Sequence, residues 1–271
     1  MSNEAASPER KPSPKIDTTV PHSARVWNYW LGGKDNYPVD REAGDAFARL
    51  CPKIIVDARA TRHYMARAVR HLAGETGIRQ FLDIGTGLPT VDNTHQIAQR
   101  VAPESRIVYV DNDPLVLAHA RALLTSTPEG RTWYIDADVR DPESILAEVS
   151  GLLDLSRPTA LMLMGILGHV ADLAEARSIV RRLMDALPSG SHLVHYDGTD
   201  VDEACTRATR FYNDNSGGIA YHLRTPEQLG TLHEGLETLE PGMVMVTHWR
   251  PDPSPFDLPD TTQFGAVSRK P

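Results

Sequence analysis

The 271-residue sequence has few features that would attach it to a membrane, a metal or a redox partner. Its two cysteines, Cys51 and Cys205, match no metal-ligand or redox spacing, so we expect reduced thiols. The longest apolar run, residues 160–167, is far shorter than the roughly 20 residues that span a bilayer. No basic and apolar signal segment is visible at the start. These absences predict a cytoplasmic protein with no metal centre and no membrane partner.

Basic charge is also scarce, with 28 Lys and Arg residues against 36 Asp and Glu residues and a net charge of −8. A nucleic-acid-binding protein usually displays a basic face, so nucleic acid is not an expected partner. Arg59, Arg62, Arg67 and Arg70 come nearest to a basic stripe. Their spacing is more typical of the solvated side of an amphipathic helix than of a binding patch.

Apolar runs alternate with helix-like stretches along most of the chain. Residues 1–20 are polar and rich in Pro and Ser, and they predict a disordered tail. Helices are expected at 40–49, with Asp40 as N-cap, at 56–73 and at 173–187. The strand-like runs lie at 80–84, 106–110, 132–135, 160–164 and 192–196. Strand, helix and strand in this rhythm predict a parallel sheet with right-handed crossovers.

The C-terminal part has a different pattern. Thr225, Pro226 and Gln228 form the start signal of a further helix. Beyond it, 242–249 and 263–270 are strand candidates separated by 13 residues without a helix, which favours an antiparallel pair.

The predicted fold is therefore α/β. It is a Rossmann-like, doubly wound and mostly parallel seven-stranded sheet with an antiparallel C-terminal hairpin. The sheet domain is expected at 76–271, after a helical cap segment at 21–75.

The stretch "FLDIGTGLPT", residues 81–90, places Asp83, Gly85 and Gly87 at a predicted strand exit. Such a turn holds either a nicotinamide or flavin dinucleotide or S-adenosylmethionine (SAM). Glycines let the backbone approach a ligand, and the following helix start favours negative groups such as a methionine carboxylate. A dinucleotide turn requires Gly or Ala at position 90, where Thr90 stands, so SAM is favoured over NAD.

The next strand exits supply further nucleoside-binding groups. Asp111 lies 28 residues after Asp83, where a carboxylate can accept from both ribose hydroxyls. Asp138 can accept from an adenine amino group, Val139 offers a backbone N–H, and Gly165 leaves room beside a nucleoside. The full predicted cofactor set is Asp83, Ile84, Gly85, Thr86, Gly87, Asp111, Asn112, Asp138, Val139, Met164 and Gly165.

These motifs resemble the class I SAM-dependent methyltransferases. The segments "ARVWNYWLGGKDNYPVDRE", "LDIGTGLPT" and "PGMVMVTHWRPD" further resemble an actinobacterial family of these enzymes, formerly a domain of unknown function, whose N-terminal motif reads roughly "YxLGGKDN". The likeness runs from about residue 21 to the end. It implies the methyltransferase fold, SAM as cofactor and S-adenosylhomocysteine (SAH) as product, and it supplies no acceptor. Pro89, where a third glycine often sits, resembles this family's own variant.

Candidate catalytic residues are few. Methyl transfer from a sulfonium is an in-line displacement that needs a base only when the nucleophile must lose a proton. Histidine and tyrosine near the strand exits supply the candidates His169, Tyr196 and His222, with His195 as a further possibility. No Asn/Asp-Pro-Pro-aromatic run and no Pro-Cys pair is present. A small-molecule acceptor is therefore favoured over a nucleobase.

An aromatic segment at 26–37 surrounds the pair Gly32–Gly33. Its rings either line an acceptor pocket or pack a helical cap on the sheet. Charged groups flanked by glycine in such a stretch are costly to bury alone, which suggests a loop over the cofactor. The substrate or lid candidates are Tyr29, Gly33, Lys34, Asp35 and Tyr37.

The sequence is compatible with three functions. The leading one is a SAM-dependent methyltransferase that acts on a small molecule. A SAM- or SAH-binding sensor without catalysis is the second, and an NAD-dependent oxidoreductase is the third.

Overall fold

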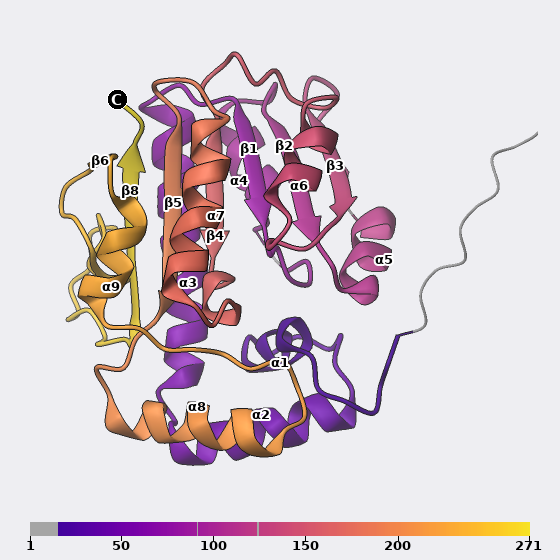
Figure 1. Ribbon diagram of the computed structural model, residues 1–271, viewed down its shortest axis with the longest axis vertical. Helices are drawn as coiled ribbons and strands as arrows, with labels where there is room; N and C mark the ends of the chain where they lie inside the picture. Colours follow the sequence, from indigo (N-terminus) through magenta and orange to yellow (C-terminus); the bar gives the residue numbers. More distant parts are fainter. Residues whose placement is uncertain (1–15, 91, 124) are drawn as a thin grey trace, which may run out of the picture.

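Five of the apolar runs form the parallel core of one sheet in the computed structural model, which describes residues 16–90, 92–123 and 125–271 (Figure 1). Neighbouring strands follow the order β3-β2-β1-β4-β5-β8-β6, and the first five pair in parallel. The order reverses between β1 and β4, which is where open sheets of this kind bind ligands. The parallel strands are β1 (Gln80–Ile84), β2 (Arg106–Asp111), β3 (Arg131–Asp136), β4 (Ala160–Met164) and β5 (His192–Gly198).

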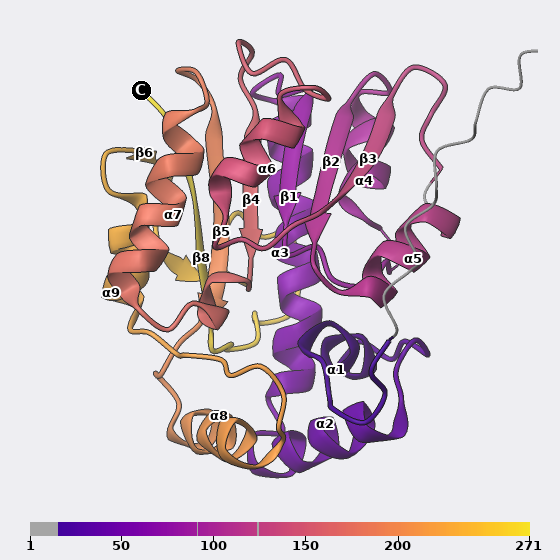
Figure 2. The same cartoon turned by 45° about the vertical axis from the view of Figure 1, so that its right-hand side comes forward.

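Helices cover both faces of the sheet because buried parallel strands expose apolar side chains on each side (Figures 1 and 2). One face packs on α3 (Ile54–Gly74) and α4 (Thr94–Val101), through residues such as Tyr64 and Ile97. The opposite face packs on α6 (Pro142–Val149) and α7 (Leu173–Asp185). The remaining short elements are α5 (Pro114–Leu123), η1 (Leu167–His169), α9 (Pro226–Gly230) and η2 (Thr231–His233).

The antiparallel C-terminal pair is confirmed, with shorter strands than predicted. β8 (Gln263–Arg269) runs antiparallel to β5, and β6 (Glu237–Thr238) and β7 (Val244–Met245) both pair with β8. The sheet of the described residues therefore has eight strands, where the sequence predicted seven. The predicted strand at 242–249 is mostly irregular because its end leaves the sheet: Trp249 is fully buried beside Tyr64 of α3, with ring centroids 5.6 Å apart.

A helical cap faces the carboxyl ends of the strands (Figure 2). It consists of α1 (Ser23–Trp30), α2 (Pro38–Leu50), α8 (Glu203–Asn215) and the start of α3. α8 packs along α2 although about 150 residues separate them, so the cap extends beyond the 21–75 segment. The shared core of the cap includes Val26, Trp30, Phe47, Ile54, Ala208 and Tyr212.

The predicted N-cap of α2 is wrong. Tyr37 is the N-cap, and Pro38 occupies the first turn, where its missing N–H costs nothing. Asp40 lies one turn inside and accepts from the Tyr37 N–H at 2.8 Å. The predicted cap of α9 is confirmed, since Thr225 accepts from the Gln228 N–H.

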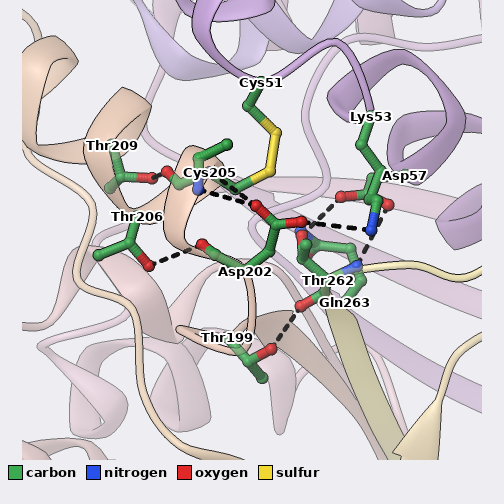
Figure 3. The surroundings of a disulfide bond; sticks show 11 residues. Cys51, Lys53, Asp57, Thr199, Asp202, Cys205, Thr206, Thr209, Thr262 and Gln263 are labelled. Carbon is green, nitrogen blue, oxygen red and sulfur yellow. Dashed lines mark hydrogen bonds and ion pairs between the residues drawn. A yellow bond between two sulfur atoms is a disulfide. The ribbon is translucent and has the colours of Figure 1, made fainter.

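The expectation of reduced thiols is also wrong. Cys51 and Cys205 form a disulfide that joins the α2–α3 corner to α8, with Cα atoms 4.8 Å apart (Figure 3). The pair is 154 residues apart in sequence, so no local spacing could reveal it. None of the helices described is long and apolar enough to cross a membrane.

Candidate functional site

A cavity of about 240 Å³ lies between the strand exits and the cap. We distinguish two halves by the side chains that line it. The nucleoside half comprises the exits of β1, β2 and β3, with Arg62 of α3 beside them. The cap half comprises the exits of β4 and β5, the cap helices and residues 219–223, and its lining includes Trp27, Trp30, Phe47, Ile54, His169, Tyr196, Tyr212, Tyr221 and Leu223.

The turn after β1 depends on its glycines. Gly85 and Gly87 have φ angles of +74° and +67°, in the left-handed region that side chains with a Cβ avoid. Gly85 donates to the Val110 carbonyl at 2.8 Å. A Cβ at position 85 would lie 2.6 Å from the side chain of Ile166, so the turn can pass under that residue only as glycine. The predicted glycine turn therefore brings the backbone to the cavity wall.

Asp83 is a buried acid at the start of this turn. It accepts a hydrogen bond from the Thr94 hydroxyl at 2.6 Å. Burial raises the pKa of its carboxyl to about 6, against the opposing effects of Thr94 and Arg62. Arg62 is itself partly buried, and it donates to the Asp92 carbonyl at 2.9 Å. Although both line the cavity, no direct ion pair joins Arg62 to Asp83 among the described side chains.

Asp111 and Asp138 follow β2 and β3 in the same half of the cavity. Asp111 is 8% exposed, and its two oxygens accept from the Gly87 and Asp113 N–H groups at 2.8 and 2.9 Å. Each oxygen keeps a further lone pair for a ligand. Asp138 is more exposed and accepts from the Arg140 N–H at 2.9 Å, beside the buried Val139. All three predicted acids therefore line one cavity.

This half has the chemistry that SAM requires. Asp83 and Arg62, which form no ion pair with each other, offer a carboxylate and a guanidinium to the two charges of an amino acid group. Asp111 offers oxygens to vicinal hydroxyls, and the open space at Gly87, where a Cβ would meet nothing within 4 Å, admits a ligand close to the backbone. All eleven predicted cofactor residues line the cavity: Asp83, Ile84, Gly85, Thr86, Gly87, Asp111, Asn112, Asp138, Val139, Met164 and Gly165.

Of the predicted catalytic candidates, two line the cap half. His169 lies in η1 after β4, and Tyr196 lies in β5. Burial raises the pKa of Tyr196 to about 12, despite a hydrogen bond with Thr61 that lowers it. His222 is not part of the cavity lining, and its backbone N–H donates to the Gly168 carbonyl at 2.7 Å. His195 is fully buried and not in the cavity lining, and its Nε2 is hydrogen-bonded to the Asp197 carboxylate at 2.8 Å.

None of the lid candidates is among the residues that line the cavity. Tyr29 donates to Asp45 at 2.7 Å, and Tyr37 packs with Leu88 and Val116. The 33–36 turn folds around the buried Asn28 amide: Asn28 accepts from the Asp35 N–H at 3.1 Å, and Gly33 lies against its side chain. The Asp35 carboxylate lies 3.9 Å from His119. Lys34 lies in the same turn.

Two aspects of the site were absent from the sequence prediction. Arg62 was expected on a solvated face, as was Arg67, but Arg62 lines the cavity and Arg67 donates to the Trp249 carbonyl at 2.9 Å. Tyr221 lines the cavity from a segment without a recognisable motif. Only the alternation of aromatic and polar residues at 219–223 distinguishes that segment, and this pattern is too common to identify a site.

Comparison with known proteins gives a consistent result. The statistical model of a family described as S-adenosyl methyltransferase matches residues 9–271. The crystal structure of a DUF574 family protein from Streptomyces avermitilis is 51% identical, with a TM-score of 0.90, over 95% of this chain and 100% of that one. A crystal structure from Thermobifida fusca is 40% identical, with a TM-score of 0.86, over 96% of this chain and 98% of that one.

More distant structures share the fold alone. TnmH is 15% identical with a TM-score of 0.51, over 81% of this chain and 57% of that one. No curated protein matches the chain.

Proposed function

Because the chain belongs to the S-adenosyl methyltransferase family, we propose that it moves the methyl group of SAM to a small molecule held in the cap half of the cavity. The family identifies the reaction class and the cofactor. The prediction of a SAM-dependent methyltransferase is thereby confirmed over the NAD-dependent oxidoreductase. The acceptor class, the location and the residue roles are our proposal.

One observation carries the choice of acceptor: the cavity is continuous from the nucleoside half to the cap half. Methyl transfer needs the nucleophile, the methyl group and sulfur in one line, in a site that excludes water. A pocket walled by helices on one side and strand exits on the other meets both needs for a compact acceptor. The acidic composition also disfavours a nucleic-acid acceptor.

The cofactor roles follow from the charges of the lining. Asp83 binds the ammonium of the methionine moiety, and Arg62 binds its carboxylate. Asp111 accepts from the ribose hydroxyls, while Asp138 and the Val139 N–H bind the adenine edge. SAM supplies an activated methyl group, and this chain supplies alignment and exclusion of water.

A cytoplasmic location is also part of the proposal, on the sequence argument alone. The disulfide is compatible with it because both cysteines are at least 95% buried, which limits access of cellular thiols. Thiol trapping in lysates prepared under acid would show whether the bond persists in cells.

Calorimetric titration with SAH, followed by a labelled-SAM screen of small molecules, protein and nucleic acid, tests the function. We expect SAH to bind, Asp111→Ala to weaken it at least about tenfold, and label to enter a small molecule. Asp136→Ala is the matched control, since Asp136 also ends a strand but is exposed and not in the lining. Transfer to protein or nucleic acid only would refute the small-molecule acceptor.

A further inference from the structure

Among the described residues, the side chains that line the cap half of the cavity include no acid. In the described part of the chain, the acids that line the cavity are Asp83, Asp111 and Asp138, all in the nucleoside half. A buried ammonium without a carboxylate partner is costly, so the lining of the cap half favours an acceptor that carries no charge. Aromatic and aliphatic groups dominate there, and they favour a neutral aromatic ring. The apolar lining consists chiefly of Trp27, Trp30, Phe47, Ile54, Tyr212 and Leu223.

His169 also lines the cap half, and a hydrogen bond determines which nitrogen of its ring carries the proton. Its Nδ1 lies 3.0 Å from the Ala220 carbonyl, and because a carbonyl only accepts, Nδ1 carries the proton of the neutral ring. Nε2 is then left with a lone pair. Burial lowers the pKa of His169, whose charged or titratable neighbours are Asp197, His22 and Arg140. The imidazole is therefore neutral at pH 7 and can accept a proton.

Tyr221 holds the His169 ring in place. The two rings meet edge to face, with centroids 5.1 Å apart and planes at 87°. The Tyr221 hydroxyl donates to Asp197 at 2.7 Å. The Asn213 side chain accepts from the Tyr221 backbone N–H at 3.0 Å and donates to the Tyr221 carbonyl at 2.8 Å. A Cβ at Gly168 would overlap the Tyr221 ring, so the sequence leaves room for that ring with glycine.

We propose that the methyl acceptor is a neutral aromatic hydroxyl compound, with His169 as the catalytic base and Tyr221 as a positioning residue. This inference rests on the proposed function, because it names the substrate class of the same cavity. The requirement for a base follows from the acceptor, since a neutral phenol must lose its proton as it is methylated.

The acceptor, His169 and SAM together account for every bond and proton in the transfer. The phenolic O–H bond breaks and its proton goes to Nε2 of His169. The oxygen electron pair forms the new bond to the methyl carbon, while the sulfur–methyl bond breaks and its electrons remain on sulfur. The products are an aryl methyl ether, SAH and an imidazolium, which returns its proton to solvent.

Two phenols of different acidity test this assignment at mildly alkaline pH. 1-Naphthol stays protonated and needs a base, whereas 4-nitrophenol is already largely phenolate and does not. We expect wild-type protein to methylate both with labelled SAM. The rate of methyl transfer by His169→Asn should be at least about 100-fold lower than that of wild type with 1-naphthol and less than about fivefold lower with 4-nitrophenol. The rate of methyl transfer by Tyr221→Phe should fall about tenfold with 1-naphthol and stay unchanged with 4-nitrophenol.

Matched measurements separate the possible failures. His63→Asn, at an exposed position on α3, should behave as wild type with both phenols. Quenching of tryptophan emission by 4-nitrophenol, in protein loaded with SAH, should report binding in wild type and His169→Asn alike. SAH binding without phenol binding, equal loss on both phenols in His169→Asn, or transfer to benzylamine in place of the phenols would each overturn the inference alone. Failure to bind SAH would overturn the proposed function as well.

Discussion

The two halves of the cavity are built in opposite ways. The nucleoside half uses charged groups at the ends of three adjacent strands, Asp83, Asp111 and Asp138, close together in the sheet. The cap half uses aromatic side chains of helices from distant parts of the sequence, joined by a disulfide across 154 residues. The sheet fixes the positions of the acids in the nucleoside half, which suits a ligand that is the same in every reaction, such as the cofactor. The second depends on how separate helices pack, so it can vary with the acceptor.

The largest expected effect of a substitution is at Gly85, in the nucleoside half. Gly85→Ala combines a left-handed φ, which costs a Cβ-bearing residue about 1–2 kcal/mol, with a clash against the side chain of Ile166, which lines the cavity. We expect SAH affinity to fall at least about 100-fold by calorimetry, since each 1.4 kcal/mol is tenfold.

Gly77→Ala is the matched control for this prediction. Gly77 has a φ of +75° and open space around a Cβ, and it precedes β1 at the other end of the sheet. Gly77→Ala should lose only the stability that the left-handed φ costs and should keep its affinity for SAH. Equal loss of affinity in both variants would show that backbone strain alone, and no local contact, explains Gly85.

The contrast between the halves also explains which features the sequence could predict. The strand at 80–84 and the acids after it lie within single local motifs, so periodicity and spacing identify them. The cap contacts join residues far apart, such as Cys51 with Cys205, and carry no local signal. Arg62 is an example of the same limit: helical spacing gives the face of a helix but not whether that face meets solvent or a cavity. The predicted tail at 1–20 lies mostly outside the described residues.

The second prediction concerns the cap alone. Loss of the disulfide frees a long loop in the unfolded chain, so the Cys51→Ser, Cys205→Ser double variant should be less stable by about 2–4 kcal/mol. Urea denaturation measures the loss, and dithiothreitol should lower the stability of wild type but not of the variant. We expect SAH affinity to change little, because the nucleoside half lies on the sheet. A large loss of SAH affinity would show that the two halves are not independent.

The pH dependence of SAM binding provides a third, smaller test, in the nucleoside half. Burial raises the pKa of Asp83 to about 6, so the carboxyl becomes neutral as the pH falls below that value. A neutral carboxyl attracts the SAM ammonium less. Affinity should therefore fall by up to about tenfold per pH unit below pH 6 and level off above pH 7. Asp83→Asn should bind more weakly and lose this dependence; an unchanged slope in that variant would assign the titration to another group.

The smallest effects are expected at two helix N-caps that differ mainly in location. Asp202 caps α8 in the cap and accepts from the Ala204 and Cys205 N–H groups, while Asp172 caps α7 on the sheet and accepts from the Ala174 N–H. Replacing either with Ala should cost about 1 kcal/mol of stability in urea denaturation. Asp202 also lies 3.3 Å from Lys53, in the corner that holds the disulfide (Figure 3). Because the cap helices help to line the acceptor pocket, Asp202→Ala should weaken quenching by 4-nitrophenol while Asp172→Ala leaves it unchanged, and both should bind SAH as wild type does.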